Sequence, residues 1–148
     1  MNYGKSSGPA SEVRVAVLMT CHNRREHTLA CLRALRAAEI EARQTCDVYL
    51  LDDGSSDGTA EAVANEFPHV HLLRGDGSLF WNRGMHRVFE AALRRGYDFY
   101  LGLNDDTLLY PDALRRLLTC HARITQESGR SGIVAGSTRD ATSGELTY

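Results

Sequence analysis

The segment from Val13 to Thr20 constrains the fold of this chain more than any other. It reads Val-Arg-Val-Ala-Val-Leu-Met-Thr, an apolar run that is rich in β-branched residues and carries one charge. Such a run is typical of a strand buried on both faces, and strands of this kind occur in parallel sheets that are covered by helices. The segment therefore predicts a central strand of a mostly parallel sheet.

The rest of the chain alternates between apolar runs and amphipathic segments. Further strands are expected at 48–51, 70–73, 97–103 and 132–136. Helices are expected at about 29–38, 60–67 and 82–95, and again after Pro111, which suits the first position of a helix. Strands and helices thus alternate four times, which predicts an α/β domain with right-handed crossovers and a sheet flanked by helices.

The length and the net charge of the chain limit the classes of protein to which it can belong. The 148 residues suit one domain, which we place at 12–148. The net charge of -2 leaves no basic surplus, so nucleic acid is not an expected partner. No apolar run reaches the roughly 20 residues of a transmembrane helix. Residues 1–11 are rich in Gly, Ser and Pro and lack a signal peptide's apolar core, so we interpret them as a disordered leader or an expression remnant. A cytoplasmic protein is expected.

Two further features concern the cysteines and the end of the chain. The four cysteines match no metal or disulfide spacing, and we expect reduced residues of the core. The chain stops at Tyr148 without a terminal helix, so we expect the domain to be truncated at its C-terminus.

Polar residues follow three of the predicted strands at the points where the strands end. Ligands of an open parallel sheet bind beyond the carboxyl ends of its strands, and burial disfavours charge, so acidic strand ends suggest one shared site. The three clusters are Thr20-Cys21-His22-Asn23-Arg24, Asp52-Asp53-Gly54-Ser55 and Asn104-Asp105-Asp106.

The two acidic clusters each have a structural alternative. Asp-Gly-Ser-Ser-Asp-Gly at 53–58 is favourable turn chemistry, and Asp57 or Thr59 can cap the following helix. Asp53 stands apart because it lies at the strand tip. Adjacent Asp105 and Asp106 suit Mg²⁺ or Mn²⁺ shared with phosphate oxygens, but an acidic turn before a helix explains them equally well.

The loop from Gly75 to Gly84 holds the only tryptophan of the chain. The loop could close over a sugar, with Arg83 facing a phosphate, or Phe80 and Trp81 could simply pack on the core. For Arg74 a solvated charge at the strand end is favoured over phosphate binding. No catalytic triad and no P-loop can be assigned from the spacing.

Together these motifs resemble glycosyltransferase family 2, whose members have the Rossmann-like GT-A fold of nucleotide-diphospho-sugar transferases. The first strand with Thr20-Cys21-His22-Asn23-Arg24 is similar to the family's nucleotide-base loop. Leu51 to Thr59 is similar to its most recognisable motif, and Tyr100 to Asp106 lies where the family carries its Asp-x-Asp metal motif. The segment 79–85 further resembles the rhamnosyltransferase-like branch. The resemblance covers residues 13–148.

The resemblance implies roles for individual residues. Asp53 would bind the uracil or thymine ring, Asp106 would bind Mn²⁺ or Mg²⁺, and Asp105 would lie near the ribose or sugar. Asn104 replaces the first acid of the metal motif and could offer a neutral oxygen ligand. The nucleotide-binding set then comprises Thr20, His22, Asn23, Arg24, Asp52, Asp53, Gly54, Arg83 and Asp105, with Asp106 and Asn104 at the metal. The catalytic base would lie beyond Tyr148.

The implied reaction transfers a sugar, with inversion, from a UDP or dTDP donor to a glycan or lipid-linked acceptor. The expected setting is cell-surface polysaccharide synthesis, in the cytoplasm or at the inner face of the membrane, with a possible homo-oligomer. Two alternatives stay open. A sugar-nucleotide nucleotidyltransferase also uses carboxylate-bound Mg²⁺ but needs a Gly-rich basic loop after its first strand, and a non-catalytic nucleotide-binding domain needs no base.

Overall fold

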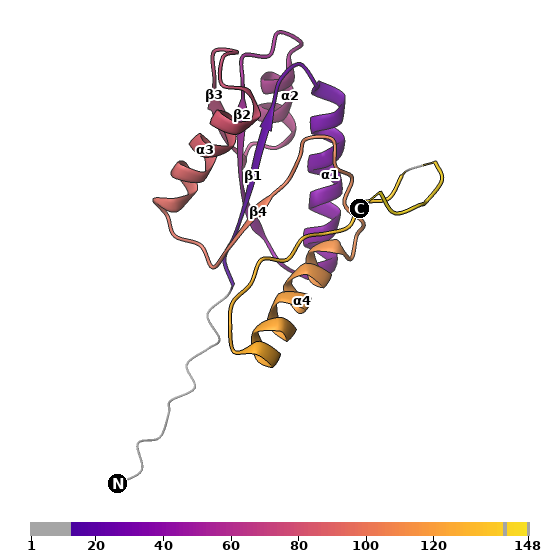
Figure 1. Ribbon diagram of the computed structural model, residues 1–148. Coiled ribbons are helices and arrows are strands. Elements are labelled where there is room, and N and C mark those ends of the chain that lie inside the picture. The colour runs from indigo at the N-terminus through magenta and orange to yellow at the C-terminus, as the bar shows by residue number, and fades with distance from the viewer. Residues whose placement is uncertain (1–12, 141, 148) are drawn as a thin grey trace.

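The computed structural model describes residues 13–140 and 142–147 and shows an α/β fold (Figure 1). The interpretation of residues 1–11 as a leader lies outside the described residues. The elements, in chain order, are β1 (Val15–Cys21), α1 (Arg25–Ala42), β2 (Cys46–Asp52), α2 (Thr59–Glu66), β3 (His71–Arg74), α3 (Phe80–Leu93), β4 (Phe99–Gly102) and α4 (Ala113–Ser128).

The four strands form one parallel sheet in the order β3-β2-β1-β4. β1 is central, as its sequence predicts, and pairs along its full length with β2 and over its first half with β4. The expected mostly parallel sheet is therefore confirmed. Because every strand runs the same way, all four carboxyl ends lie at one edge of the sheet.

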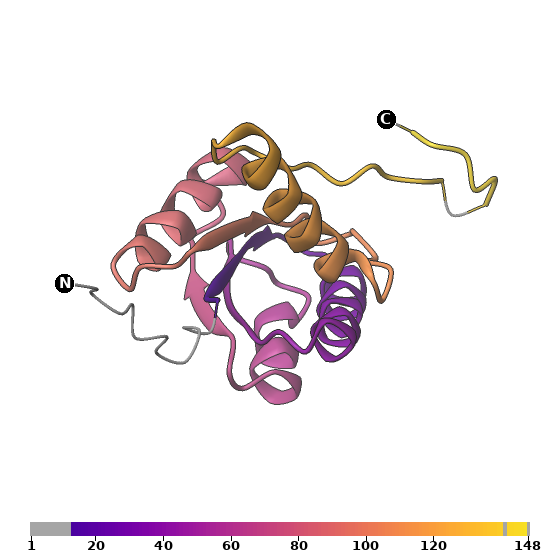
Figure 2. The ribbon, with the colours of Figure 1, turned by 90° about the horizontal axis from the view of Figure 1, so that it is seen from below.

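Helices cover both faces of the sheet. α3 packs on one face against β1 and β2, whereas α1 lies on the other face and contacts both α2 and α4 (Figure 2). Alternate residues of β1 enter two separate cores, because successive side chains of a strand point to opposite faces. Val17 and Met19 join the core under α1, and Ala16 and Leu18 join the core under α3.

The predicted fifth strand at 132–136 is wrong. This segment pairs with no strand, and the side chain of Ile133 is fully exposed. An apolar run becomes a strand only where a neighbouring backbone supplies hydrogen bonds, and between glycines it gains little from local propensity. Within the described part of the chain, the only pairing after α4 is an isolated antiparallel bridge between Arg139 and Leu146.

The first helix begins earlier than its sequence predicts, at Arg25, and also ends later, where a tertiary hydrogen bond holds its last turn. The apolar spacing ends near Ala38, whereas α1 continues to Ala42. Glu39 is buried in the added turn, and its Oε1 accepts a hydrogen bond of 2.7 Å from the backbone N–H of Cys46 at the start of β2. A buried carboxylate needs such a partner, and this hydrogen bond connects the end of the helix to the sheet.

The cysteines are all free thiols, as expected, and three of the four are buried in the core.

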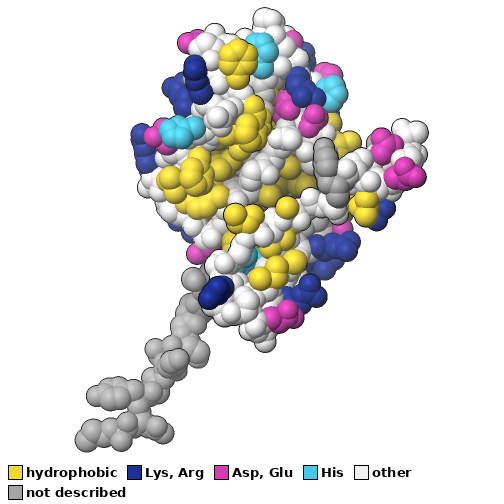
Figure 3. Space-filling model, viewed as in Figure 1, with side chains coloured by type: hydrophobic (Ala, Val, Ile, Leu, Met, Phe, Trp, Pro, Cys, Tyr) yellow, Lys and Arg dark blue, Asp and Glu magenta, His cyan; other side chains and the backbone are white. Residues whose placement is uncertain are grey.

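The outer surface shows apolar side chains gathered across the middle of the face seen in Figure 1 (Figure 3). No helix among the described residues is long and apolar enough to cross a membrane.

Candidate functional site

The three polar clusters of the sequence meet at the carboxyl edge of the sheet. β1 ends at Cys21 beside Asp52 of β2, and the backbone N–H of Asp53 donates to the carbonyl of Cys21 at 2.9 Å. On the other side, the N–H of Leu103 donates to the carbonyl of Leu18 at 3.0 Å, which brings the residues after β4 beside β1. All three clusters therefore lie together at this edge of the sheet.

Asp53 holds the start of α3. Its Oδ1 accepts a hydrogen bond of 3.0 Å from the N–H of Gly77, and its Oδ2 accepts bonds of 3.0 Å from Leu79 and 2.8 Å from Phe80. The residue is only 3% exposed. The first N–H groups of a helix have no partner within the helix, and they attract negative charge. The Asp53 carboxylate therefore satisfies donors at the N-terminus of α3.

This arrangement limits how Asp53 can contact a base. A carboxylate oxygen has two lone pairs, and Oδ1 uses one of them on Gly77. The predicted contact with a pyrimidine edge would therefore use the second lone pair of Oδ1, while Oδ2 stays on the helix.

Gly54 lets the loops after β2 and β3 come close together. Its φ is +70°, and a Cβ at this position would lie 2.8 Å from the backbone nitrogen of Gly77. A side chain would therefore be strained by its backbone conformation and would clash with the loop that Asp53 holds. Gly54 belongs to the predicted nucleotide-binding set, and the structure gives it this steric role.

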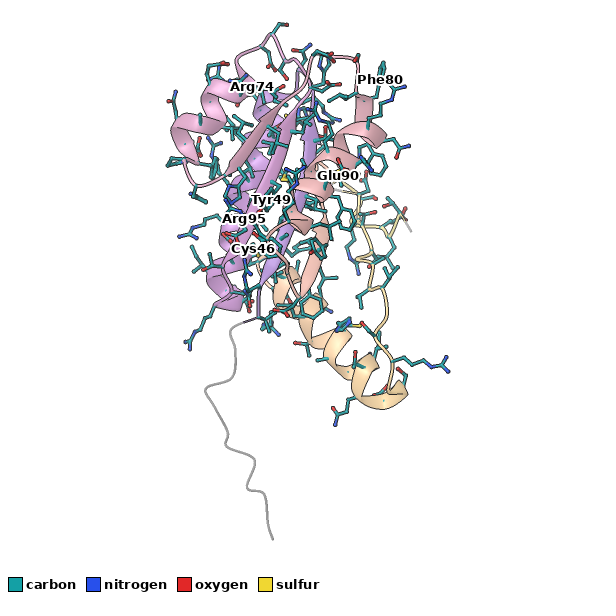
Figure 4. The ribbon with its side chains drawn as sticks, turned by 90° about the vertical axis from the view of Figure 1, so that its left-hand side faces the viewer. Cys46, Tyr49, Arg74, Phe80, Glu90 and Arg95 are labelled. Atoms are coloured by element: carbon teal, nitrogen blue, oxygen red, sulfur yellow. The ribbon has the colours of Figure 1, made fainter. Side chains whose placement is uncertain are left out.

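Phe80 adopts the left-handed region although it is not a glycine. Its φ is +54°, and such a conformation costs on the order of 1–3 kcal/mol. The hydrogen bond to Asp53 offsets part of this cost. The side chain extends from the start of α3 into solvent and is 77% exposed (Figure 4).

His22 and Asn23 join the first cluster to the second. The Nδ1 of His22 lies 2.6 Å from the carbonyl oxygen of Asp53, which can only accept, so we place the imidazole hydrogen on Nδ1. The Nε2 of His22 then accepts from the Nδ2 of Asn23 at 3.0 Å. Asn23 in turn accepts a bond of 2.7 Å from the N–H of Ser56. These bonds fix the loop after β1 against the turn after β2.

Asp52 closes the turn after β2. It is almost completely buried, and its Oδ1 accepts a hydrogen bond of 2.9 Å from the N–H of Ser55. Arg74 lies 3.8 Å from its Oδ2 and also pairs with Glu61 at 3.1 Å. Arg74 thus stays half-exposed at the end of β3 as a solvated strand-end charge, the role that its sequence context favours.

Arg24 balances the acidic pair after β4. Its Nη2 lies 2.8 Å from Oδ2 of Asp106, and its Nη1 lies 3.6 Å from Oδ1 of Asp105. The side chain of Asp106 is 43% exposed, whereas that of Asp105 is 9% exposed. Burial raises the pKa of Asp105 above its usual range, and Arg24 partly opposes this rise.

The acidic pair has one unsatisfied oxygen. Oδ2 of Asp105 is buried and has no hydrogen-bond partner among residues 13–140 and 142–147. Unpaired buried carboxylate oxygens are costly, so this atom marks a position where a ligand could supply the missing contact.

The residues fit a divalent metal that is shared with a phosphate-bearing ligand. No group of three His, Cys, Asp or Glu side chains in the described ranges is placed to hold an ion, which excludes a cage made only of these side chains there. Mg²⁺ and Mn²⁺ commonly bind one or two carboxylates and take their remaining ligands from substrate phosphates and water. Half-exposed Asp106, beside the unpaired oxygen of Asp105, suits this mode of binding.

Trp81 and Gly84 place α3 against the site. The Nε1 of Trp81 donates to Oδ1 of Asn104 at 3.3 Å, which connects the start of α3 to the residues after β4. One turn later, a Cβ on Gly84 would lie 2.6 Å from Oγ1 of Thr20. Gly84 therefore allows the helix to approach β1 closely, and Thr20 lies under α3.

Asp106 and Arg83, both expected near the phosphates, line two different surface cavities. A cavity of about 260 Å³ is lined by Asp106, Leu108 and residues of α1. Arg83 instead lines a cavity of about 430 Å³ with Leu79, Asn82, His86 and Arg87, and its Nη1 donates to the carbonyl of Ser78 at 3.4 Å. Arg24, rather than Arg83, is the arginine that contacts the acidic pair.

Sequence reasoning did not single out Glu26 and His27, which line the cavity beside Asp106. A usable signal was their position in the first turn of α1, two and three residues after Arg24. The start of a helix that follows a central strand lies at the same edge of the sheet as the other strand ends.

Comparisons with known proteins identify relatives of this chain. A hyaluronan synthase from Streptococcus pyogenes is 27% identical over 121 residues, which cover 78% of this chain and 28% of the relative. An N-acetylglucosaminyltransferase from Mesorhizobium japonicum is 31% identical over 110 residues, covering 70% of this chain and 24% of that protein. The chain thus spans about a quarter of the length of these curated relatives.

Solved structures of glycosyltransferases share the fold. The mannosyltransferase PcManGT from Pyrobaculum calidifontis, in complex with GDP-Man and Mn²⁺, matches with a TM-score of 0.56 at 22% identity, covering 74% of this chain and 32% of that one. S. aureus TarS 1-349 matches with a TM-score of 0.59 at 14% identity, covering 88% of this chain and 42% of that one. The expected GT-A fold is confirmed.

A family model gives the assignment directly. The model described as glycosyl transferase family 2 matches residues 16–126, which include all four strands except the first residue of β1, all three polar clusters and most of α4. This chain belongs to glycosyl transferase family 2.

Proposed function

We propose that this chain is the donor-binding part of an enzyme that transfers a sugar from a nucleoside diphosphate to an acceptor hydroxyl. The observation that carries the proposal is the acidic pair Asp105–Asp106 at the carboxyl edge of the sheet, with Arg24 as its counter-ion. The family assignment and solved neighbours in complexes with GDP-Man and UDP support this choice of ligand.

The metal site consists of Asp106 as the direct ligand, with Asn104 offering a neutral oxygen. Mn²⁺ or Mg²⁺ bound there would neutralise the charge that develops on the departing diphosphate. With a cation on Asp106, the guanidinium of Arg24 would be free to donate to phosphate oxygens, which match its fork of N–H groups.

The nucleotide lies along the joined loops after β1 and β2. Thr20, His22, Asn23 and Gly54 shape the floor of this region, and the buried carboxylate of Asp52 keeps the turn closed. Asp53 reads the pyrimidine edge through Oδ1 while it holds α3. Sugars carried on UDP or dTDP are the donors that this contact favours. Arg83 supports the loop through Ser78 at the edge of the site.

The transfer step is a single displacement with inversion. The acceptor oxygen forms a bond to the anomeric carbon as the bond between that carbon and the terminal phosphate oxygen breaks. The hydroxyl proton passes to a carboxylate base supplied from outside this chain. We assign the acceptor to the glycan or lipid-linked class and the enzyme to the rhamnosyltransferase-like branch, working in cell-surface polysaccharide synthesis at the cytoplasmic face of the membrane.

Calorimetric titration of the 148-residue chain with UDP, dTDP and GDP, with and without Mn²⁺, tests the proposal. We expect binding that requires the metal and that is lost in Asp106→Ala. Glu127→Gln is the matched control, because it neutralises an exposed carboxylate on α4 far along the chain from the site. Preference for a nucleoside triphosphate would instead indicate a nucleotidyltransferase, and absence of binding would indicate a scaffold domain.

A further inference from the structure

We propose that Trp81, with Phe80 beside it, forms a platform for the pyranose ring of a sugar next to the acidic pair Asp105 and Asp106. The inference rests on the proposed function, because it assigns the part of the site that holds a sugar rather than the nucleotide.

The position of the indole points to a sugar. Its Nε1 donates to Oδ1 of Asn104, the residue that directly precedes the acidic pair. The indole therefore reaches from the start of α3 to Asn104, one residue before the carboxylates to which we assign the metal and the diphosphate. The transferred sugar is attached to the terminal phosphate, so a ring bound there would lie close to these carboxylates and within reach of Trp81.

The aromatic pair is exposed although it is held in place. Trp81 is 59% exposed. The side chain of Phe80 is more exposed still. Its backbone is left-handed, and its backbone N–H donates to the carboxylate of Asp53. Leu108 and Ile133 are also exposed, but both lie in loops. Among the described residues, neither accepts a hydrogen bond from a side chain of the site nor donates one to it. Large apolar groups that are fixed and left open to water are typical of binding surfaces.

The chemistry of the platform suits a pyranose. A sugar ring presents C–H groups on its faces and hydroxyl groups around its rim, so it needs an apolar surface with polar groups at the margin. The indole N–H is already satisfied by Asn104, which leaves the aromatic faces as the free binding surface. Asn104 and the two carboxylates supply the polar margin.

Intrinsic fluorescence tests the platform directly, because Trp81 is the only tryptophan of the chain. The chain is loaded with Mn²⁺ and either UDP, dTDP or GDP, and quenching of Trp81 by acrylamide is measured. Quenching is then measured again with Mn²⁺ and a sugar nucleotide in place of the nucleotide: UDP-glucose, UDP-N-acetylglucosamine, dTDP-rhamnose or GDP-mannose. We expect that at least one sugar nucleotide protects Trp81 from the quencher and that its parent nucleotide does not.

A second arm distinguishes the donor sugar from the acceptor sugar. Methyl glycosides of glucose, N-acetylglucosamine, rhamnose and mannose are added to the chain saturated with UDP and Mn²⁺. Protection by a sugar nucleotide assigns the platform to the donor, and protection by a methyl glycoside assigns it to the acceptor. Either result supports a pyranose platform.

Substitutions give a readout that does not depend on fluorescence. In calorimetry, Trp81→Ala should weaken binding of the protecting sugar ligand about tenfold, while binding of the parent nucleotide stays unchanged. Trp81→Phe keeps an aromatic face and should bind within about twofold of the unchanged chain. Leu93→Ala removes another exposed apolar side chain from the last turn of α3 and should have no effect.

The outcomes separate the two proposals. If a nucleoside diphosphate binds with Mn²⁺ but no sugar of either arm protects Trp81, the platform is refuted and the proposed function stands. If no nucleoside diphosphate binds, the proposed function fails and the platform fails with it.

Discussion

Arg24 and Asp106 form the closest ion pair of the acidic cluster, with Nη2 and Oδ2 only 2.8 Å apart. Arg24 follows the central strand β1 and Asp106 follows the edge strand β4, so the contact spans the carboxyl edge of the sheet. The guanidinium lies where a metal bound to Asp106 would have to approach.

Removing this counter-ion should strengthen metal binding. In Arg24→Gln the carboxylates keep their charge but lose a competing cation, so Mn²⁺ should bind up to about fivefold more tightly without nucleotide, as expected for a half-exposed ion pair. With Mn²⁺ present, UDP should bind more weakly, because Arg24 no longer meets the phosphates. Electron paramagnetic resonance of free Mn²⁺ and calorimetry with UDP measure the two effects. Arg25→Gln is the matched control, and unchanged or weaker Mn²⁺ binding in Arg24→Gln would contradict the prediction.

Asp53 should contribute strongly to stability. Asp53→Asn removes the charge and turns one acceptor into a donor that faces backbone N–H groups. The free energy of unfolding should fall by about 2–4 kcal/mol, since hydrogen bonds to a charged group are worth about 1.5–3 kcal/mol each. Urea unfolding measures the loss, and amide exchange at Leu79 and Phe80 should become faster. The exposed substitution Glu127→Gln should leave both quantities unchanged. Slow exchange at these amides in Asp53→Asn would mean that another group holds the helix.

The close approach of α3 to β1 requires a glycine at position 84. In Gly84→Ala the added Cβ meets Oγ1 of Thr20, and such overpacking costs about 1–3 kcal/mol. Adding Thr20→Ala should recover part of the loss, because it removes the atom that clashes. A double-mutant cycle based on urea unfolding measures this coupling.

Gly102→Ala is the matched control for this prediction. Its nearest neighbour, Cε of Met85, would lie 3.8 Å from the added Cβ, which is ordinary contact. Additive effects of Gly84→Ala and Thr20→Ala would show that the two residues do not clash.

The buried thiols should be unreactive and should make the fold sensitive to high pH. Burial, with help from nearby carboxylates, raises the pKa of Cys21, Cys31 and Cys46 to about 12. These thiols ionise first in the unfolded chain, at the ordinary pKa near 9, so the unfolded state binds fewer protons than the folded state between about pH 9 and 12. Each thiol should therefore lower the free energy of unfolding by up to about 1.4 kcal/mol per pH unit in this window.

Alkylation gives the direct measurement. Iodoacetamide at pH 8.5 should modify Cys120, which is only partly buried, and should leave the other three thiols intact. Cys120→Ser should then take up no label until urea is added. Uniform labelling of all the cysteines in the folded chain would disprove their burial.

Much of the fold and the location of the site could be predicted from local patterns. The mostly apolar run at Val13–Thr20 predicts a strand covered on both faces. The carboxyl ends of parallel strands must lie at one edge, which already brings Asp53 and Asp106 to the same region. These conclusions need only the order of residues and the geometry of a parallel sheet.

The remaining features depend on contacts between distant segments. Glu39 extends α1 because it bonds to Cys46, and the apolar segment around Ile133 is no strand because no backbone pairs with it.

The division between sequence and tertiary structure is clearest in the site itself. Local sequence patterns are enough to place these side chains at the strand ends, because the turn after each buried strand of a parallel sheet lies at a known edge. Their partners follow from the packing of the whole fold: Arg24, rather than Arg83, contacts the acidic pair, and the N-terminus of α3 donates to Asp53. Hydrogen bonds and ion pairs form over a few ångströms, so they depend on how loops far apart in the chain pack together, which no local pattern encodes.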